Sequence, residues 1–226
     1  MKTIVISGAN RGIGLELTKQ FAKDNIVYAL CRSDFPQNEL NDNIKVVNLD
    51  ITNGEAIISF ANELNNAQVA VDLLINNAGI AGGDMDKDEV KIDTKSATEV
   101  FATNVVGPMI LSLHLKTALK RAVQPVMIAI SSKMGTHAML NDYSAEWWPY
   151  SSSKAALSLA VSAFAMKNPE IKTISVHPGW VKTRMGGDDA DIEPFESASG
   201  IKALYDTIDT LESGRLYNYD GTIMAW

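Results

Sequence analysis

Apolar positions along the chain follow two alternating patterns. Short, nearly unbroken apolar runs rich in β-branched residues predict strands buried on both faces. These runs cover residues 3–7, 26–30, 44–49, 71–75, 125–130, 173–177 and 216–219. Longer stretches with apolar residues spaced by three or four predict helices. The helical stretches cover residues 12–24, 53–64, 95–121, 150–167 and 196–211, with a break or kink expected at Gly107-Pro108.

Strands that alternate with helices predict right-handed crossovers and a parallel sheet covered on both faces. The expected fold class is therefore α/β, a doubly wound (Rossmann) sheet of about seven strands. No linker rich in Pro, Gly or Ser and no internal repeat interrupts the pattern, so residues 1–226 are predicted to form a single domain. Ligands of such sheets bind beyond the carboxyl ends of the strands. We therefore expect the chemistry directly after each apolar run.

The first predicted strand runs into a glycine-rich turn, Ser7-Gly8-Ala9-Asn10-Arg11-Gly12-Ile13-Gly14. Gly8 permits a tight turn, Gly12 lets the backbone approach a pyrophosphate, and Gly14 lets the next helix pack closely. The helix N-terminus supplies free N–H groups and a positive dipole end. This context favours a dinucleotide site over an ordinary glycine-rich loop. No Gly-Lys-Ser/Thr follows, which argues against a nucleoside triphosphate loop.

The end of the second strand indicates which dinucleotide binds. Sites for NAD usually carry an acid there, which binds the ribose 2′-hydroxyl. Here the segment is Cys31-Arg32-Ser33, and a guanidinium would pair with a 2′-phosphate, assisted by Arg11. The sequence therefore predicts NADP(H) rather than NAD(H).

Polar or small residues also follow the third and fourth strands. Asp50 either accepts a hydrogen bond from the adenine amino group or caps the following helix, and the sequence leaves both open. Asn76-Asn77-Ala78-Gly79 comes after the fourth strand. An amide and small side chains there can line the cofactor and link neighbouring strands.

Composition narrows the range of functions. The chain has 226 residues, 46% of them hydrophobic and 21% charged, with a formal charge of −7, which is typical of a soluble globular protein. The charge argues weakly against nucleic acid binding. The single cysteine, Cys31, fits a reducing compartment. Neither a signal peptide nor a membrane span is apparent, so we expect a cytoplasmic protein. Three dispersed histidines and one cysteine predict no metal site.

Tyr150 and Lys154 are four residues apart and so lie on one helix face. Tyrosine has a reference pKa near 10, and a nearby ammonium group would lower it. The pair follows Ser131-Ser132 at the end of the fifth strand. With the glycine turn, the Asn-Asn-Ala-Gly segment and His177-Pro178-Gly179, this order resembles the short-chain dehydrogenase/reductase family over nearly the whole chain. Within it, HPGWVKT, Met185-Gly186-Gly187 and the ending LYNYDGTIMAW are similar to C-factor-like carbonyl reductases.

The resemblance implies a role for each matching residue. Tyr150 is the general acid-base, Ser132 helps bind the substrate carbonyl, and Lys154 binds the nicotinamide ribose and lowers the Tyr150 pKa. Asn104 helps hold a water in the proton relay. The implied cofactor-binding residues are Ser7, Gly8, Asn10, Arg11, Gly12, Ile13, Gly14, Arg32, Asp50, Ile51, Asn77, Ala78, Gly79, Tyr150, Lys154, Pro178, Gly179, Val181 and Thr183. Val181 and Thr183 resemble residues that contact the nicotinamide carboxamide and the nearby phosphate.

Two departures from the family pattern stand out. Ser7 replaces the usual Thr. Ser132 and Tyr150 are eighteen positions apart, which is longer than usual, so a segment must loop out between them. The choice of Ser132 over Ser131 follows the family's second-serine pattern. The inserted residues 133–149 either wall an apolar substrate pocket or pack on the protein's own surface. The resemblance implies a substrate lid at residues 186–194, which are few and acidic here, and this predicts an open site with loose or bulky substrate use.

The predicted function is an NADP(H)-dependent oxidoreductase that moves a hydride between the nicotinamide and a ketone, aldehyde or secondary alcohol. One alternative is a sensor or signalling protein that binds NADP(H) with little turnover. Another is a non-redox epimerase or dehydratase, for which the short length leaves little room. Helices 104–115 and 150–166 carry almost no charge. Their outer faces predict a homodimer, with cover by the chain's own loops as the alternative.

Overall fold

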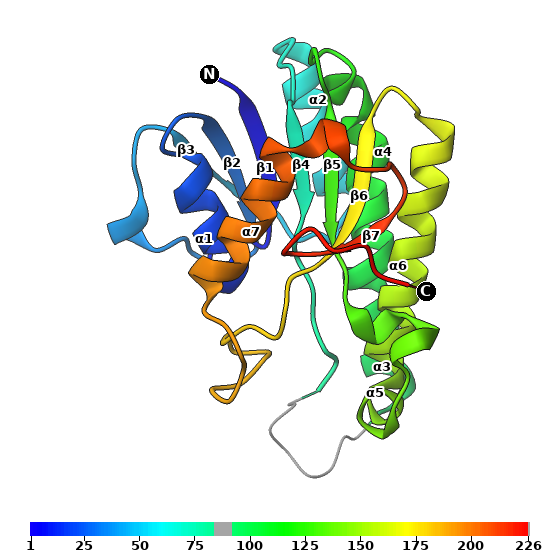
Figure 1. Cartoon of the computed structure of the whole chain (residues 1–226). Coiled ribbons are helices and arrows are strands. Elements are labelled where there is room, and N and C mark those ends of the chain that lie inside the picture. The colour runs from blue at the N-terminus through cyan, green and yellow to red at the C-terminus, as the bar shows by residue number, and fades with distance from the viewer. Residues whose placement is uncertain (84–91, 226) are drawn as a thin grey trace.

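Seven parallel strands form the centre of the computed structural model, which describes residues 1–83 and 92–225. The strand order is β3-β2-β1-β4-β5-β6-β7, so the chain winds outward in both directions from β1 (Figure 1). The strands are β1 (Thr3–Ser7), β2 (Ile26–Cys31), β3 (Ile44–Asn48), β4 (Leu73–Asn76), β5 (Val126–Ile130), β6 (Lys172–His177) and β7 (Leu216–Asn218). This is the expected doubly wound parallel sheet in a single domain. Trp226, the last residue of the terminal motif, lies outside the described residues.

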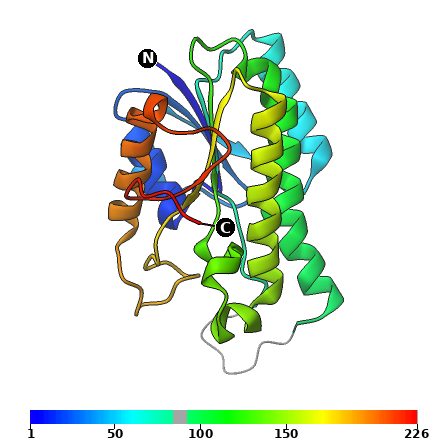
Figure 2. The same ribbon diagram turned by 45° about the vertical axis from the view of Figure 1, so that its right-hand side comes forward.

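Helices cover both faces of the sheet (Figure 2). One face packs against α1 (Gly12–Phe21) and α7 (Pro194–Asp206), and the other against α2 (Gly54–Asn66), α4 (Gly107–Leu119) and α6 (Trp148–Lys167). In β1, Ile4 and Ile6 belong to the first core while Val5 belongs to the second, because side chains alternate across a strand. Both faces are buried, which explains the unbroken apolar runs.

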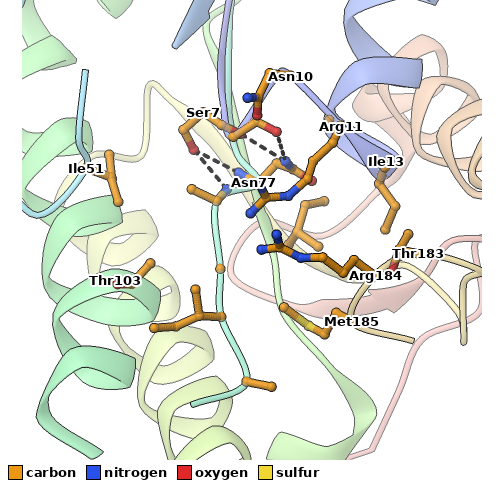
Figure 3. A pocket seen from close by; sticks show the side chains of 18 of the residues that line it. Ser7, Asn10, Arg11, Ile13, Ile51, Asn77, Thr103, Thr183, Arg184 and Met185 are labelled. Atoms are coloured by element: carbon orange, nitrogen blue, oxygen red, sulfur yellow. Dashed lines mark hydrogen bonds between the residues drawn. The ribbon is translucent and has the colours of Figure 1, made fainter. Parts of the chain in front are cut away.

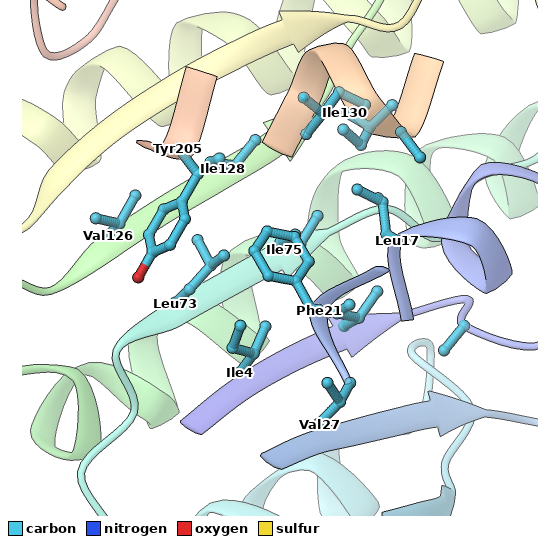
Figure 4. Close-up of a cluster of buried hydrophobic side chains, with 14 of the residues drawn as sticks. Ile4, Leu17, Phe21, Val27, Leu73, Ile75, Val126, Ile128, Ile130 and Tyr205 are labelled. Carbon is cyan, nitrogen blue, oxygen red and sulfur yellow. The ribbon is translucent and has the colours of Figure 1, made fainter. Parts of the chain in front are cut away.

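The first core shows how the central strands are held against their helices (Figure 4). Phe21 of α1 meets Tyr205 of α7 edge to face, with ring centroids 5.7 Å apart. Leu17 is fully buried below them against the strands. Burying such side chains contributes about 1.5–3 kcal/mol each, so this layer fixes α1 and therefore the turn that precedes it.

The predicted helix 95–121 is divided into three parts. It begins as α3 (Thr94–Phe101), passes through a π-helical stretch η2 (Ala102–Val106) and continues as α4. Gly107-Pro108 does not break it. Pro108 lies in the first turn of α4, where its missing N–H removes one helical hydrogen bond at the junction with η2. The irregularity falls instead on the residues just before, which include Asn104.

The start of α2 excludes one of the two alternatives for Asp50. The cap is Asn53, whose side chain accepts a hydrogen bond from the Ala56 amide at 3.1 Å. Asp50 instead accepts hydrogen bonds from the amide and hydroxyl of Thr52, both at 2.8 Å. The helix-capping interpretation of Asp50 was therefore wrong.

The inserted residues 133–149 form short helical turns rather than an open loop. They contain η3 (Lys133–Gly135), η4 (His137–Met139) and α5 (Asp142–Glu146). Another short turn, η5 (Ile208–Thr210), follows α7, and η1 (Gln37–Glu39) follows β2. Across the described part of the chain, no helix has both the length and the apolar character that crossing a bilayer requires.

Candidate active site

A cavity of about 960 Å³ lies at the carboxyl ends of the strands, where the doubly wound fold places ligands (Figure 3). Most residues that the sequence predicted as cofactor-binding line it. These are Ser7, Gly8, Asn10, Arg11, Gly12, Ile13, Gly14, Arg32, Asp50, Ile51, Asn77, Ala78, Gly79, Tyr150, Lys154, Pro178 and Thr183. The structure thus brings together residues that are more than 170 positions apart in the sequence.

The glycine turn is tight because two of its glycines adopt left-handed backbone conformations. Gly8 has φ +65° and Gly12 has φ +52°. A Cβ on Gly8 would lie 2.9 Å from the Ala78 Cα, and one on Gly14 would overlap the Gly8 carbonyl. The turn is therefore closed to side chains on the side of β4, and Gly12 opens the N-terminus of α1 toward the cavity.

Ser7 and Asn77 tie the glycine turn to the segment after β4 (Figure 3). The Ser7 hydroxyl accepts hydrogen bonds from the amides of Asn77 and Ala78, both at 3.1 Å. The Asn77 side chain donates to the carbonyls of Ser7 at 2.9 Å and Gly8 at 3.1 Å. The hydroxyl thus serves as an acceptor in place of the usual threonine, and the amide links neighbouring strands as predicted.

At the β2 end of the cavity, the exposed Arg32 lies near Asp50. Burial opposes ionisation of Asp50, but the two hydrogen bonds from Thr52 and the nearby charge of Arg32 leave its pKa lowered. Asn10 donates to the Ser33 hydroxyl at 2.9 Å and so holds the turn after β2 against the glycine turn. This end combines a guanidinium and a carboxylate, which suit a ribose phosphate and an adenine amino group respectively.

The opposite end of the cavity holds Tyr150 and Lys154 on the first turns of α6, both buried. The Lys154 ammonium lies 5.6 Å from the centre of the Tyr150 ring and donates to the Ile130 carbonyl at 2.8 Å. Gly79 lies next to the lysine, since a Cβ there would be in van der Waals contact with Lys154 Nζ at 3.5 Å. The end of β5 therefore anchors the lysine beside the tyrosine.

The two serines after β5 point to different partners. Ser131 is buried and hydrogen-bonds to the Lys154 carbonyl at 3.1 Å and the Ser158 hydroxyl at 2.7 Å, which joins β5 to α6. The Ser132 hydroxyl accepts a hydrogen bond from the Met134 amide at 3.2 Å and lies close enough to the Tyr150 phenol to lower its pKa. The structure therefore sets Ser132, the serine chosen from the family pattern, beside the tyrosine.

Burial is the main influence on the pKa values of Tyr150 and Lys154, and the pKa of Tyr150 differs from the expectation. Burial raises the pKa of Tyr150 to about 12, opposed by the Ser132 hydroxyl. Burial lowers the pKa of Lys154 to about 8. The expected lowering of the Tyr150 pKa by Lys154 is not found, because desolvation of the phenolate outweighs a cation that faces the Ile130 carbonyl.

Asn104 lies behind the cavity wall, in the π-helical stretch η2, and is fully buried. Its side-chain oxygen accepts from the Ile80 amide at 2.9 Å, and its Nδ2 donates to the Ile80 carbonyl at 2.9 Å and to Ser153 at 3.0 Å. The side chain thus connects the segment after β4 to α6. The widened π turn presents it to both neighbours.

Gly179 and Val181 are not among the cavity-lining residues. Gly179 has φ +88°, and a Cβ there would lie 2.6 Å from Ile192. Val181 pairs with Ile192 in a short parallel bridge, and Lys182 forms an ion pair with Glu193 at 2.9 Å. These contacts fold the acidic segment 186–194 back on itself, so the two residues shape the loop after β6.

The insertion supports the tyrosine rather than lining the cavity. None of residues 133–149 is among the residues that line this cavity, and their role as the wall of a substrate pocket stays a prediction. Trp147 is buried against Ala81 and Tyr150, and Met134 and Met185 pack on the same cluster. The insertion therefore fixes the start of α6 from behind.

Several lining residues were not predicted. Thr103, Ile80 and Met185 contribute to the wall, and Arg184 carries a guanidinium into the cavity (Figure 3). Arg184 directly follows the predicted Thr183, so its position in the sequence was a usable signal. Ile80 and Thr103 had the same signal, because they are next to the predicted Gly79 and Asn104.

The cavity fits a dinucleotide. It extends from Arg32 and Asp50 at one end to Tyr150 and Lys154 at the other, with the free amides of the α1 N-terminus between them. The residues present thus offer a cation for a ribose phosphate, a helix N-terminus for a diphosphate and a buried proton donor at the far end.

Comparisons with known proteins agree with this geometry. The family model of short chain dehydrogenases matches residues 2–193. This chain is a short-chain dehydrogenase/reductase. The family consists of oxidoreductases that use nicotinamide cofactors.

Individual relatives of this short-chain dehydrogenase/reductase cover much or all of its length. C-signal of Myxococcus xanthus is 34% identical over 163 residues, which are 69% of this chain and 93% of C-signal. The carbonyl reductase Sniffer of D. melanogaster is 28% identical, with a TM-score of 0.87 and full coverage of both chains. A short-chain dehydrogenase/reductase of Burkholderia multivorans with bound NADP is 26% identical, with a TM-score of 0.88, and the match covers 100% of this chain and 99% of that one.

Proposed function

We propose that this protein is an NADPH-dependent carbonyl reductase. The observation that carries the proposal is the meeting of Tyr150 and Lys154 at one end of a cavity whose other end holds Arg32, with Ser132 beside the Tyr150 phenol. The similarity to Sniffer, a carbonyl reductase, supports the substrate class.

The chemistry follows from the state of each side chain. A nicotinamide cofactor supplies the hydride to the carbonyl carbon. With a pKa of about 12, Tyr150 keeps its proton at neutral pH and is ready to donate it to the developing alkoxide. The Ser132 hydroxyl, next to that phenol, hydrogen-bonds the same oxygen. Lys154 holds the nicotinamide ribose, and Asn104 fixes the segments on either side of the site.

We propose NADP(H) as the cofactor because Arg32 and Arg11 both line the cavity, Arg32 at the end of β2 beside Asp50. A guanidinium binds a phosphate in a bidentate, charge-assisted manner. The bound NADP in the Burkholderia relative supports the same choice.

We further propose a homodimer formed through α4 and α6. We also propose a cytoplasmic location, which the single buried free thiol of Cys31 supports.

The test follows NADPH absorbance with a panel of ketones and aldehydes. We expect turnover by the wild type, and Tyr150→Phe should lower kcat by about 10²–10⁴ while the Kd for NADPH stays within twofold, since only the proton donor is lost. Equal turnover by both proteins would contradict the role of Tyr150.

One alternative has an observation of its own. Similarity to C-signal favours a protein that binds NADP(H) and acts as a signal with little turnover. The same panel separates the two: tight NADPH binding without oxidation of NADPH by any carbonyl compound would favour the signalling role.

A further inference from the structure

Three arginines line the cavity without an ion pair or a side-chain hydrogen bond to another described residue. Arg11 belongs to the glycine turn, Arg32 follows β2, and Arg184 follows β6. Within residues 1–83 and 92–225, none of them forms an ion pair or donates a hydrogen bond to the chain. The protein has 27 acidic and 20 basic residues, so acids are not scarce. The lack of paired acids is therefore specific to this cavity and does not follow from the composition of the chain.

The guanidinium groups of Arg11 and Arg184 approach each other across the cavity (Figure 3). Burial lowers the pKa of Arg11, and the like charges of Arg184 and then Arg32 lower it further. Among the described residues that line the cavity, Asp50 is the only acid, and it is held by Thr52 on the side of Arg32. Arg11 and Arg184 thus repel each other in the free protein, and an anion between them would relieve that repulsion.

A rigid turn sets the position of Arg184. The Gly187 amide donates to the Thr183 carbonyl at 3.0 Å, and the Gly186 amide donates to the Thr183 hydroxyl at 3.1 Å. Trp180 then donates to the Gly186 carbonyl at 2.8 Å. A Cβ on Gly12 would lie 3.2 Å from Thr183, so this turn rests directly on the glycine turn. Arg184 is therefore held beside the N-terminus of α1.

This position lies between the two ends of the cavity. Arg32 marks the ribose-phosphate end next to Asp50, and Tyr150 marks the reaction end. The part of a dinucleotide that lies between its two nucleosides is the diphosphate, and the amides at the N-terminus of α1 are suited to it. The anion nearest to Arg184 is accordingly the diphosphate, not the ribose phosphate.

We propose that Arg184, together with Arg11, binds the diphosphate of the dinucleotide and sets the affinity for every dinucleotide regardless of its ribose phosphate. Arg32, at the ribose-phosphate end, is then the main determinant of the preference for NADP(H) over NAD(H). This inference rests on the proposed function, because it takes the ligand of the cavity to be a nicotinamide dinucleotide.

The experiment measures dissociation constants by calorimetry for two probes that separate the anions. ADP-ribose carries the diphosphate without a 2′-phosphate, and adenosine 2′-monophosphate carries the 2′-phosphate without a diphosphate. Each is titrated, alongside NADPH, into the wild type, Arg184→Gln, Arg32→Gln and Arg215→Gln. Arg215 is the matched control, because it is exposed, pairs with Glu212 at 3.0 Å and does not line the cavity.

Arg184→Gln should raise the Kd for NADPH and ADP-ribose by about tenfold and leave the Kd for adenosine 2′-monophosphate unchanged, as loss of one charge-assisted contact predicts. Arg32→Gln should show the reverse selectivity, and Arg215→Gln should match the wild type. The ligand-free melting temperature of Arg184→Gln should be equal to or above that of the wild type, because a repulsion is removed rather than a structural contact.

An unchanged Kd of Arg184→Gln for ADP-ribose would overturn the inference, as would a loss confined to adenosine 2′-monophosphate. A wild type that binds none of the three ligands would overturn the proposed function instead. The two failures are therefore distinguishable.

Discussion

Burial controls the ionisable side chains near the reaction end of the cavity. The pKa of Lys154 falls to about 8, and that of His177 falls to about 4, chiefly through burial, with Lys133 adding to the effect on the histidine. Protonation of either side chain therefore destabilises the folded state relative to the unfolded chain. Each makes a separable contribution to the pH dependence of stability.

Lys154→Met tests the first contribution. In the unfolded chain the lysine pKa returns to 10.5, so the unfolded state binds more protons between pH 8 and 10.5, and stability rises with pH in that window. Relative to the variant, the wild-type free energy of unfolding should rise by about 3 kcal/mol across it. Urea denaturation at a series of pH values measures this. Parallel curves for the two proteins would contradict the low pKa.

His177→Gln tests the second contribution at acidic pH. His177 Nδ1 is buried without a hydrogen-bond partner, and the unfolded histidine pKa is 6.5. The folded pKa is lower, so stability is fully present above pH 6.5 and is lost as the pH falls from 6.5 toward 4. The wild type should lose more stability than His177→Gln over that range. Equal losses in thermal melts at pH 7 and pH 4.5 would show that another group is responsible.

Arg32→Asp tests cofactor preference at a single side chain. The change removes a cation from the ribose-phosphate end and adds a like charge to a 2′-phosphate. We expect kcat/KM for NADPH to fall by about 10- to 100-fold, and that for NADH to change much less. Steady-state kinetics with both cofactors measure the ratio. An unchanged preference for NADPH would contradict the assignment.

At the level of elements, the join between η3 and α6 aligns the catalytic side chains. A Cβ on Gly135 would lie 2.6 Å from the Ala155 amide nitrogen and 2.7 Å from the Lys154 carbonyl carbon, which are backbone atoms that cannot turn aside. Ser132 precedes η3, and Tyr150 lies on α6. Any separation of the two elements would therefore move the serine away from the tyrosine.

Gly135→Ala should accordingly lower the free energy of unfolding by about 1–3 kcal/mol, because the overlap forces the backbone apart. It should also lower kcat with little change in the Kd for NADPH. Gly54→Ala is the matched control, because a Cβ at that helical position meets nothing within 4 Å. Chemical denaturation and kinetics measure both effects. Wild-type behaviour of Gly135→Ala would show that η3 does not position Ser132.

At the level of the whole molecule, exposed apolar side chains lie on three neighbouring elements: α4, α6 and the π-helical stretch η2. Met166 is 83% exposed, Leu159 69%, Val106 56% and Leu113 50%. These side chains fit the proposal that a second copy of the chain covers this face.

Light scattering should show a dimer at micromolar concentration, and Leu159→Glu should dissociate it because the glutamate would be buried at the interface. Val123→Glu is the control, since Val123 is 99% exposed and lies beyond the end of α4. A monomeric wild type would contradict the dimer.

The amino-acid pattern by itself determined the order of strands and helices, the parallel sheet and the sites where polar residues follow the strands. Periodicity and local turn chemistry carry that information, because each depends on neighbours in the chain. The glycine turn and the Tyr150–Lys154 pair were predictable for the same reason. In place of the break expected at Gly107-Pro108, a π-helical turn that contains Asn104 ends directly before these residues.

Only the tertiary structure decided how the site is arranged. It turned Ser131 toward α6 and Ser132 toward Tyr150, although the two are adjacent in sequence. It reversed the expected direction of the Tyr150 pKa, since desolvation depends on everything that surrounds a group. It also brought Arg184 to Arg11, more than 170 positions away. Burial, and electrostatic interactions between residues far apart in the sequence, arise only once the chain has folded.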